Sequence, residues 1–138
     1  MMQLYHVSEC SFPVDPSWDD RSFYQYRNDD IDVVVVRRPR ERDLQTFVDA
    51  QIASFRLGMS RYKLHASTKS DRPTPGAILL RHQYETAAGP RYDAFAFFDL
   101  FDRTCAFVAS GPADRAEVTE HVFERFLKTF RPRELAKP

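Results

Sequence analysis

Residues 77–110 carry the pattern that decides the fold, and they read 77-AILLRHQYETAAGPRYDAFAFFDLFDRTCAFVAS-110. Apolar runs alternate here with two short turn signals, Ala88-Gly89-Pro90 and Asp102-Arg103. Runs of this length, rich in aromatic residues and separated by tight turns, are typical of antiparallel strands. The segment therefore predicts a meander of three strands, over Ala77–Glu85, Tyr92–Leu100 and Thr104–Ser110.

Further strands are predicted on the N-terminal side of this meander. Ile31–Arg37 contains four consecutive valines, which favour a strand. Shorter runs predict the strands Leu4–Val7, Ser11–Val14, Ser22–Tyr26 and Tyr62–Ser67. Pro13 and Pro16 place the first two of these runs at a sheet edge. Proline has no backbone N–H to donate, so it is tolerated only where a strand lacks a neighbour.

Two amphipathic helices complete the pattern. The first begins at Asp43, a favourable N-cap, and ends near Gly58. The second begins with a capping box formed by Asp114 and Glu117 and is stopped by Pro132. In both helices apolar residues recur in steps of three and four, which makes one continuous stripe. The stripes are Leu44, Phe47, Val48, Ile52, Phe55 and Met59, then Val118, Val122, Phe123, Phe126, Leu127 and Phe130.

The composition is that of one folded domain. The chain has 138 residues, of which 43% are hydrophobic and 29% charged, enough to bury one core without disulfides or metals. We expect a single α+β domain over residues 1–138, with a curved, mainly antiparallel sheet of about six strands and two main helices. Residues 131–138 read as a frayed tail.

Charge and hydropathy exclude several classes of protein. Lys plus Arg and Asp plus Glu number 20 each, so binding to nucleic acid or to an anionic membrane is not expected. No stretch approaches the roughly 18 apolar residues of a membrane span, and no signal peptide is visible. Cys10 and Cys105 are far apart and read as two reduced thiols of a cytoplasmic protein.

No catalytic or metal-binding motif is recognisable. The sequence has no P-loop, G-x-S-x-G or G-x-G-x-x-G, and its four histidines lack the spacing of metal ligands. His82 falls in the middle of a strand, where a hydrogen-bonded structural role is expected. We therefore expect a protein that is not an enzyme and that uses no cofactor and no metal.

Two charged clusters read as solvated segments. Asp29, Asp30 and Asp32 lack the glycine and the distal glutamate of a calcium loop, so they predict a hairpin tip. The arginines within Arg37–Arg42 are interleaved with acidic residues, so they predict a charged loop and not a phosphate site.

The middle of the predicted sheet is apolar on both faces. In Ile31–Arg37, consecutive valines point to opposite faces of the strand. In Tyr92–Leu100, Phe95 and Phe97 lie on one face and Phe98 lies on the opposite face. Two arrangements remain open. If both helices cover one side, the other side is an exposed apolar sheet, which marks an interface. If one helix lies on each side, the sheet is buried within the chain.

A set of short motifs resembles one known family. They are Phe12-Pro13-Val14, Trp18-x-Asp20-x-Ser22-Phe23, Val36-Arg37, Phe47–Gln51 and Phe130-Arg131-Pro132. In this order, spread over nearly the whole chain, they are similar to the small cytoplasmic Eag-type chaperones of type VI secretion, which have the PsbP/DcrB-like fold. We expect Trp18 to anchor its turn by packing under the sheet edge, and Asp20 or Ser22 to hydrogen-bond the turn backbone.

The resemblance implies a homodimer that binds a secretion effector. Its concave sheet surface would shield the N-terminal transmembrane helices of the effector until the effector is loaded on the secretion spike. The residues implied to line this surface are Phe23, Gln25, Val34, Gln51, Phe55, Met59, Phe95 and Phe97. Gln25 departs from the family, which favours an aliphatic residue there. Gln51 would serve polar atoms of the bound helices.

Two other readings remain. One is a carrier for a small apolar ligand, which should show a closed cavity between sheet and helix. The other is an enzyme of low activity whose site is split across a dimer interface, which should show a cleft with a strongly perturbed acid or histidine. A chaperone should instead offer a groove wide enough for a helix.

Overall fold

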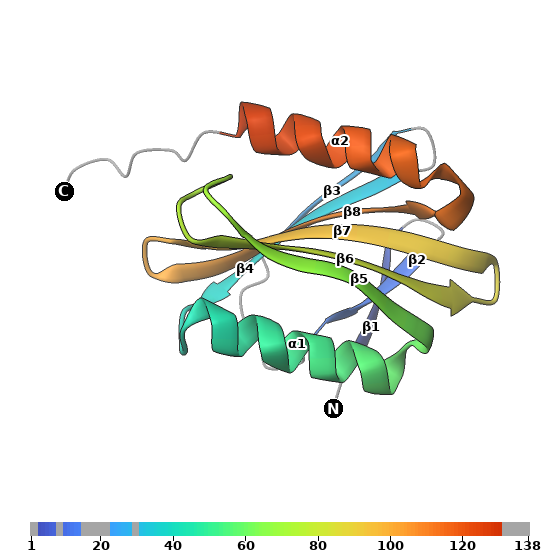
Figure 1. The fold of residues 1–138 in the computed structure, drawn as a ribbon, viewed down its shortest axis with the longest axis horizontal. Helices are drawn as coiled ribbons and strands as arrows, with labels where there is room; N and C mark the ends of the chain where they lie inside the picture. Colours follow the sequence, from blue (N-terminus) through green and yellow to red (C-terminus); the bar gives the residue numbers. More distant parts are fainter. Residues whose placement is uncertain (1–2, 8–9, 15–22, 29–30, 131–138) are drawn as a thin grey trace.

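A six-stranded antiparallel sheet forms the centre of the molecule (Figure 1). The structure is a computed structural model that describes residues 3–7, 10–14, 23–28 and 31–130, with side chains from residue 31 onward. The strands of this sheet are β3 (Phe23–Asn28), β4 (Ile31–Pro39), β5 (Ser60–Ser70), β6 (Ala77–Thr86), β7 (Gly89–Leu100) and β8 (Arg103–Pro112). Their order across the sheet is β3-β4-β8-β7-β6-β5, and every neighbouring pair is antiparallel.

Two more strands, β1 (Gln3–Val7) and β2 (Cys10–Val14), form a separate antiparallel hairpin. The hairpin makes no ladder with the six-stranded sheet. The expectations for Trp18, Asp20 and Ser22 concern residues outside the described part of the chain.

The two helices lie on opposite sides of the sheet (Figure 1). Helix α1 (Leu44–Gly58) packs against β5, β6 and β7, and the β1–β2 hairpin lies on the same side. Helix α2 (Ala116–Thr129) follows the short 3₁₀ turn η1 (Ala113–Arg115) and packs against β4, β7 and β8. Of the two arrangements that the apolar strands left open, the molecule adopts the one with a helix on each side.

The expected α+β class and the antiparallel meander are confirmed. The meander is formed by β6, which is one residue longer than predicted, and by β7 and β8, which are each three residues longer. Strand β5 is clearly longer than the predicted Tyr62–Ser67, and β4 continues to Pro39. The predicted charged loop therefore begins later. Arg38 lies within β4, is buried, and pairs with Glu41 at 2.8 Å, so the solvated reading of this arginine was wrong.

The two helices begin differently. At α1 the Asp43 carboxylate accepts a hydrogen bond from the Thr46 backbone N–H at 3.0 Å, which confirms the predicted N-cap. At α2 the predicted capping box is wrong. The η1 turn moves the helix start past Asp114, and the N-cap residue Arg115 makes no side-chain cap bond.

Each helix encloses its own apolar core with the sheet. The α1-side core contains Val34, Val36, Leu44, Phe47, Val48, Phe55, Met59, Ile78, Leu80, Tyr84, Phe95, Phe97, Ala106 and Val108. The α2-side core contains Ile31, Val33, Ala77, Leu79, Ala94, Ala96, Phe98, Cys105, Phe107, Ala109, Phe123 and Leu127. Neither α1 nor α2 is long and apolar enough to cross a membrane.

Candidate functional site

The α1 side of the sheet carries an aromatic layer between helix and strands. Phe55 of α1 lies 5.4 Å from Phe95, measured between ring centroids, and Phe95 stacks on Phe97 at 5.2 Å. Phe47 meets the edge of Phe97 at 6.0 Å. These contacts arise because the sheet-facing stripe of α1 meets alternate residues of β7, all on one face of the strand.

Six of the predicted site residues lie together on this side and are buried. They are Val34, Gln51, Phe55, Met59, Phe95 and Phe97. Phe23 and Gln25 of β3 pair with Val36 and Val34 of β4, so the register extends the same region to the next strand. The side chains of Phe23 and Gln25 lie outside the described part of the structure.

The continuous apolar surface expected at Phe95 and Phe97 is in fact the core beneath α1. These side chains are only 3% and 1% exposed, since α1 packs directly over β7. The sequence could not distinguish an open face from a covered one, because a strand buried under a helix and a strand awaiting a partner have the same apolar pattern.

A polar network crosses the same face at the C-terminal end of α1. The His82 Nε2 lies 2.8 Å from Asp93 Oδ2, and His82 Nδ1 lies 3.0 Å from the Tyr62 hydroxyl. The Tyr84 hydroxyl donates a longer bond of 3.5 Å to Asp93 Oδ1. His82 and Asp93 are both fully buried. The predicted hydrogen-bonded structural role of His82 is therefore confirmed, and its partner Asp93 is directly opposite in the β6–β7 register.

Four aromatic rings enclose the His82 imidazole. Their centroids lie 4.9–5.4 Å from it, and all four meet it edge to face: Phe55, Tyr62, Tyr84 and Phe95. Burial raises the pKa of the Tyr62 hydroxyl, which makes this group a poor nucleophile or acid near neutral pH. The network lies within the core and joins side chains of β5, β6 and β7 beneath Phe55 of α1, so it helps to fix how these elements meet.

The row of polar groups continues toward β4. Arg91 donates a hydrogen bond of 3.2 Å to the Ser110 hydroxyl, and one of its guanidinium nitrogens lies 3.7 Å from Asp32. Asp32 is only 2% exposed, so its predicted place in a solvated hairpin tip was wrong. Its Oδ1 atom has no hydrogen-bond partner in the described structure. Asp29 and Asp30 lie outside the described residues.

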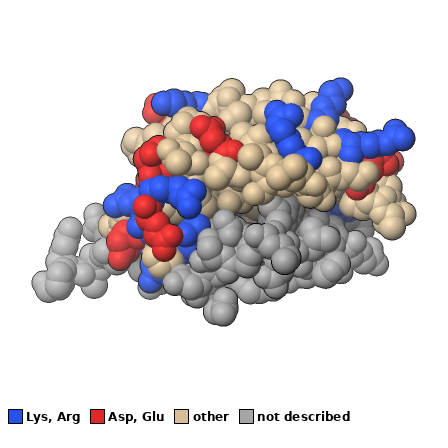
Figure 2. Space-filling model, turned by 90° about the horizontal axis from the view of Figure 1, so that it is seen from below, with Lys and Arg blue, Asp and Glu red and all other residues tan. Residues whose placement is uncertain are grey.

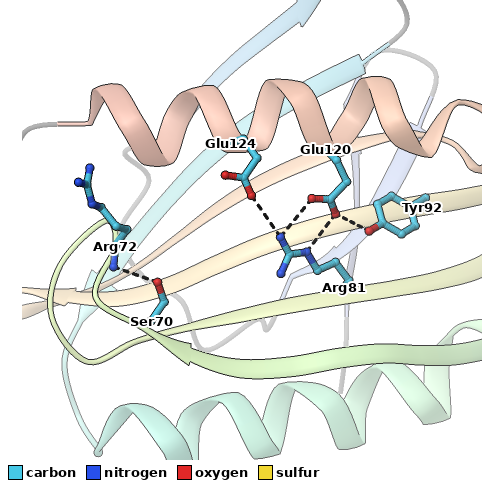
Figure 3. Close-up of polar contacts among 6 residues, drawn as sticks. All are labelled: Ser70, Arg72, Arg81, Tyr92, Glu120 and Glu124. Carbon is cyan, nitrogen blue, oxygen red and sulfur yellow. Dashed lines mark hydrogen bonds and ion pairs between the residues drawn. The ribbon is translucent and has the colours of Figure 1, made fainter.

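A second polar cluster ties α2 to the opposite side of the sheet (Figure 3). Arg81 donates two hydrogen bonds of 3.0 and 3.1 Å to Glu120 and lies 3.7 Å from Glu124, while the Tyr92 hydroxyl donates to Glu120. Although burial lowers the pKa of Arg81, the hydrogen bond and charge of Glu120 raise it overall. Burial, followed by the hydrogen bond to Glu120, raises the pKa of Tyr92. The cluster joins β6, β7 and α2 at a place that sequence patterns did not single out.

The described residues hold no group of three His, Cys, Asp or Glu side chains arranged to bind a metal ion. A half-open cavity of about 290 Å³ lies where α1 ends and β5 begins. Its lining residues are Gly58, Met59, Ser60, Tyr84, Glu85, Thr86 and Ala87.

No protein-family model matches the sequence, and no curated protein matches it. Among solved structures, the chain is similar to the crystal structure of PA94 from Pseudomonas aeruginosa, a protein of unknown function. The TM-score is 0.72 at 16% sequence identity, and the match covers 96% of this chain and 97% of that one. At this identity the likeness establishes a shared fold along almost the whole length of both chains.

Proposed function

We propose that this protein is an Eag-type chaperone, which binds and shields the N-terminal transmembrane helices of a type VI secretion effector before the effector is loaded on the spike. The sequence motifs support the family, and the fold shared with a Pseudomonas protein is compatible with it. The protein would act in the cytoplasm as a homodimer, without catalysis. The observation that carries the proposal is the position of α1, which packs mainly against β5, β6 and β7 at one end of its side of the sheet.

The other end of that side contains β4 and β8. Helix α1 packs mainly against β5, β6 and β7, and is therefore centred near β6. Neighbouring strands are about 4.8 Å apart and packed helices about 8–10 Å apart, so one helix spacing equals two strands. A partner helix lying beside α1 would therefore rest over β8, two strands away from β6 in the sheet order.

The side chains at this position suit an apolar helix. Val34, Val36, Ala106 and Val108 lie together on the α1 side of β4 and β8, where all four are buried in the α1-side core. We call these four residues the β4–β8 surface. Phe23 and Gln25 of β3 pair with Val36 and Val34 in the strand register, and Gln51 is buried on the sheet-facing stripe of α1.

The β1–β2 hairpin lies on this side of the sheet, so a partner helix requires the hairpin to move (Figure 1). The hairpin forms its own two-stranded sheet. Its displacement therefore breaks no backbone ladder of the six-stranded sheet. In this proposal Phe55, Met59, Phe95 and Phe97 form the wall under α1, and the β4–β8 surface is the floor of the groove.

Gln51 provides the test of this proposal. Replacing Phe95 or Phe97 by a charged residue would not test binding, because both side chains are buried. An unpaired charge in the core costs several kcal/mol, so the variant could lose the segment simply by unfolding. Gln51→Leu keeps the size and apolar setting of the site but removes the amide that would meet polar atoms of the bound helices. The effector's N-terminal segment is co-expressed with the chain, and its recovery with the purified chain is measured.

We expect Gln51→Leu to fold and to lower recovery of the segment by roughly threefold to tenfold. The matched control is Gln45→Leu on the same helix, where the exposed Gln45 amide bonds only to Asp49, at 2.9 Å. The control should retain the segment. Equal retention by both variants would contradict the groove, and so would an effector segment that stays soluble without the chain.

The alternative of a carrier for a small apolar ligand has one observation in its favour, the half-open cavity at the end of α1. Its volume of about 290 Å³ lies just below the usual range of ligand sites, about 300–1,000 Å³. The aromatic layer under α1 is packed ring against ring, so it leaves no comparable space there. A partner helix is therefore the better-supported occupant.

A further inference from the structure

Strand β5 forms one edge of the six-stranded sheet. Its only neighbour in the sheet is β6, and it runs along the near edge of the molecule in Figure 1. The outward N–H and C=O groups of such a strand have no ladder partner within the described structure, and they form a template for one more strand. The edge extends over eleven residues, Ser60–Ser70.

This edge is basic, although the chain as a whole is neutral. Ser60–Ser70 contains Arg61, Lys63 and Lys69 but no Asp or Glu. All three side chains are exposed, and none makes an ion pair in the described part of the chain. Figure 2 views the α1 side of the molecule, and Lys and Arg side chains project from its upper right.

The second half of β5 has the geometry that strand addition requires. Ala66–Ser70 pairs with Ala77–Arg81 in unbroken register, whereas register shifts interrupt the pairing before Ala66. Arg61 has a φ of 52°, which marks the irregular first half of the strand. A bulged stretch is a poor template, so the regular segment Ala66–Ser70 is where an added strand would form its ladder.

We propose that the outer edge of β5 binds an extended, acidic segment of a partner protein by adding it to the sheet as a further strand. Backbone bonds to Ala66–Ser70 would hold the segment, and Lys63 and Lys69 would attract its carboxylates from the two faces of the sheet. A second copy of β5 fits this edge poorly, since it would bring lysines of both copies together. The proposal concerns the opposite end of the sheet from β3 and β4 and does not rest on the chaperone function.

The test uses a fluorescent ten-residue peptide of alternating Glu and Thr, with fluorescence anisotropy as the readout. A peptide with Lys in place of Glu serves as the charge control. We expect the acidic peptide to bind and the basic one not to bind. The double variant Lys63→Glu with Lys69→Glu should weaken binding of the acidic peptide by roughly tenfold. The double variant Arg42→Glu with Arg125→Glu changes the net charge equally at exposed sites away from β5, and it should bind almost normally.

Two N-methylated acidic peptides separate strand addition from charge attraction alone. Each carries methyl groups on alternate amides, one peptide on the even positions and the other on the odd positions. Since only one set of amides faces β5, one peptide should lose binding and the other should keep it. Equal binding of both methylated peptides would overturn strand addition. Equal weakening by the two double charge variants, or no binding of the acidic peptide, would overturn the assignment to β5.

Discussion

At the scale of single residues, Gly111 shows how closely α2 approaches the sheet. A Cβ atom added to this residue would overlap the Ile31 Cδ1 and the Thr119 Oγ1, closer than non-bonded atoms approach. Ile31 and Thr119 are both fully buried, so neither can move aside without disturbing its neighbours. The absence of a side chain at this point of β8 is therefore a packing requirement.

Gly111→Ala should destabilise the fold by about 1–3 kcal/mol, because the added methyl group forces the α2-side core apart. Gly58→Ala is the matched control. Its added Cβ meets nothing within 4 Å, and in the last turn of α1 alanine restricts the unfolded chain more than glycine does. The control should leave stability unchanged or raise it slightly. Urea unfolding followed by circular dichroism measures both, and a neutral Gly111→Ala would disprove the close packing.

At the scale of elements, the two helices show which boundaries local chemistry determines. Asp43 fixes the start of α1 through two bonds from Thr46, from the backbone N–H at 3.0 Å and the hydroxyl at 2.7 Å. Asp114 and Glu117 have the spacing of a capping box, yet α2 begins at Ala116 after the η1 turn. The short connection from β8 forms the 3₁₀ turn η1 before α2 begins. The path of the chain out of the sheet therefore overrides the capping signal of Asp114 and Glu117.

The Asp43 cap should make the stability of α1 depend on pH. The hydrogen bonds from Thr46 lower the pKa of the Asp43 carboxyl below its ordinary value. The stabilisation is therefore fully present above the unfolded pKa of about 3.9 and is lost as pH falls through the lower folded pKa. Asp43→Ala should thus lower Tm at about pH 7, and the difference from the unmodified chain should shrink toward about pH 2. Thermal unfolding at both pH values checks this, and a difference independent of pH would rule out the charged cap.

At the scale of the whole molecule, the described surface displays few large apolar side chains. Leu57 on the outer side of α1 and Phe101 in the β7–β8 turn are the exposed ones among residues 31–130. Beside α2, in contrast, Val35, Phe126 and Phe130 pack against the α2-side core and remain partly exposed. This strip, which includes Val35 next to the edge strand β3, is the described apolar surface that best suits a second copy.

We expect a homodimer in solution, because the sequence resemblance implies one and this partly exposed strip could accommodate it. Light scattering at micromolar concentration should give about twice the monomer mass of 16.1 kDa. Val35→Glu should shift the mass to that of the monomer while circular dichroism stays unchanged, since Val35 is only partly buried. A wild-type mass of one chain at every concentration would contradict the dimer, and a Val35→Glu dimer would exclude this strip as its interface.

The sequence by itself determined the elements and their facing residues. Alternation in the meander, the stripe of α1 and the Asp43 cap are local features, and each depends only on residues a few positions apart. Strand parity placed Phe95 and Phe97 on one face, and the family resemblance implied that Val34, Gln51 and Phe55 lie on the same side, where the structure has them. The position of His82 in the middle of a strand also predicted its hydrogen-bonded structural role.

The tertiary structure decided what covers those residues. Apolar burial has no direction, so an apolar face does not specify whether α1, α2 or a partner covers it. Strand β4 pairs with β8 across more than sixty residues of chain, and this long-range pairing brings Val34 and Val108 into the α1-side core. The same pairing buries Asp32 and Arg38. Both residues lie near segments predicted as a turn or loop, but they pair with Ser110 and Thr104 of β8 within the sheet.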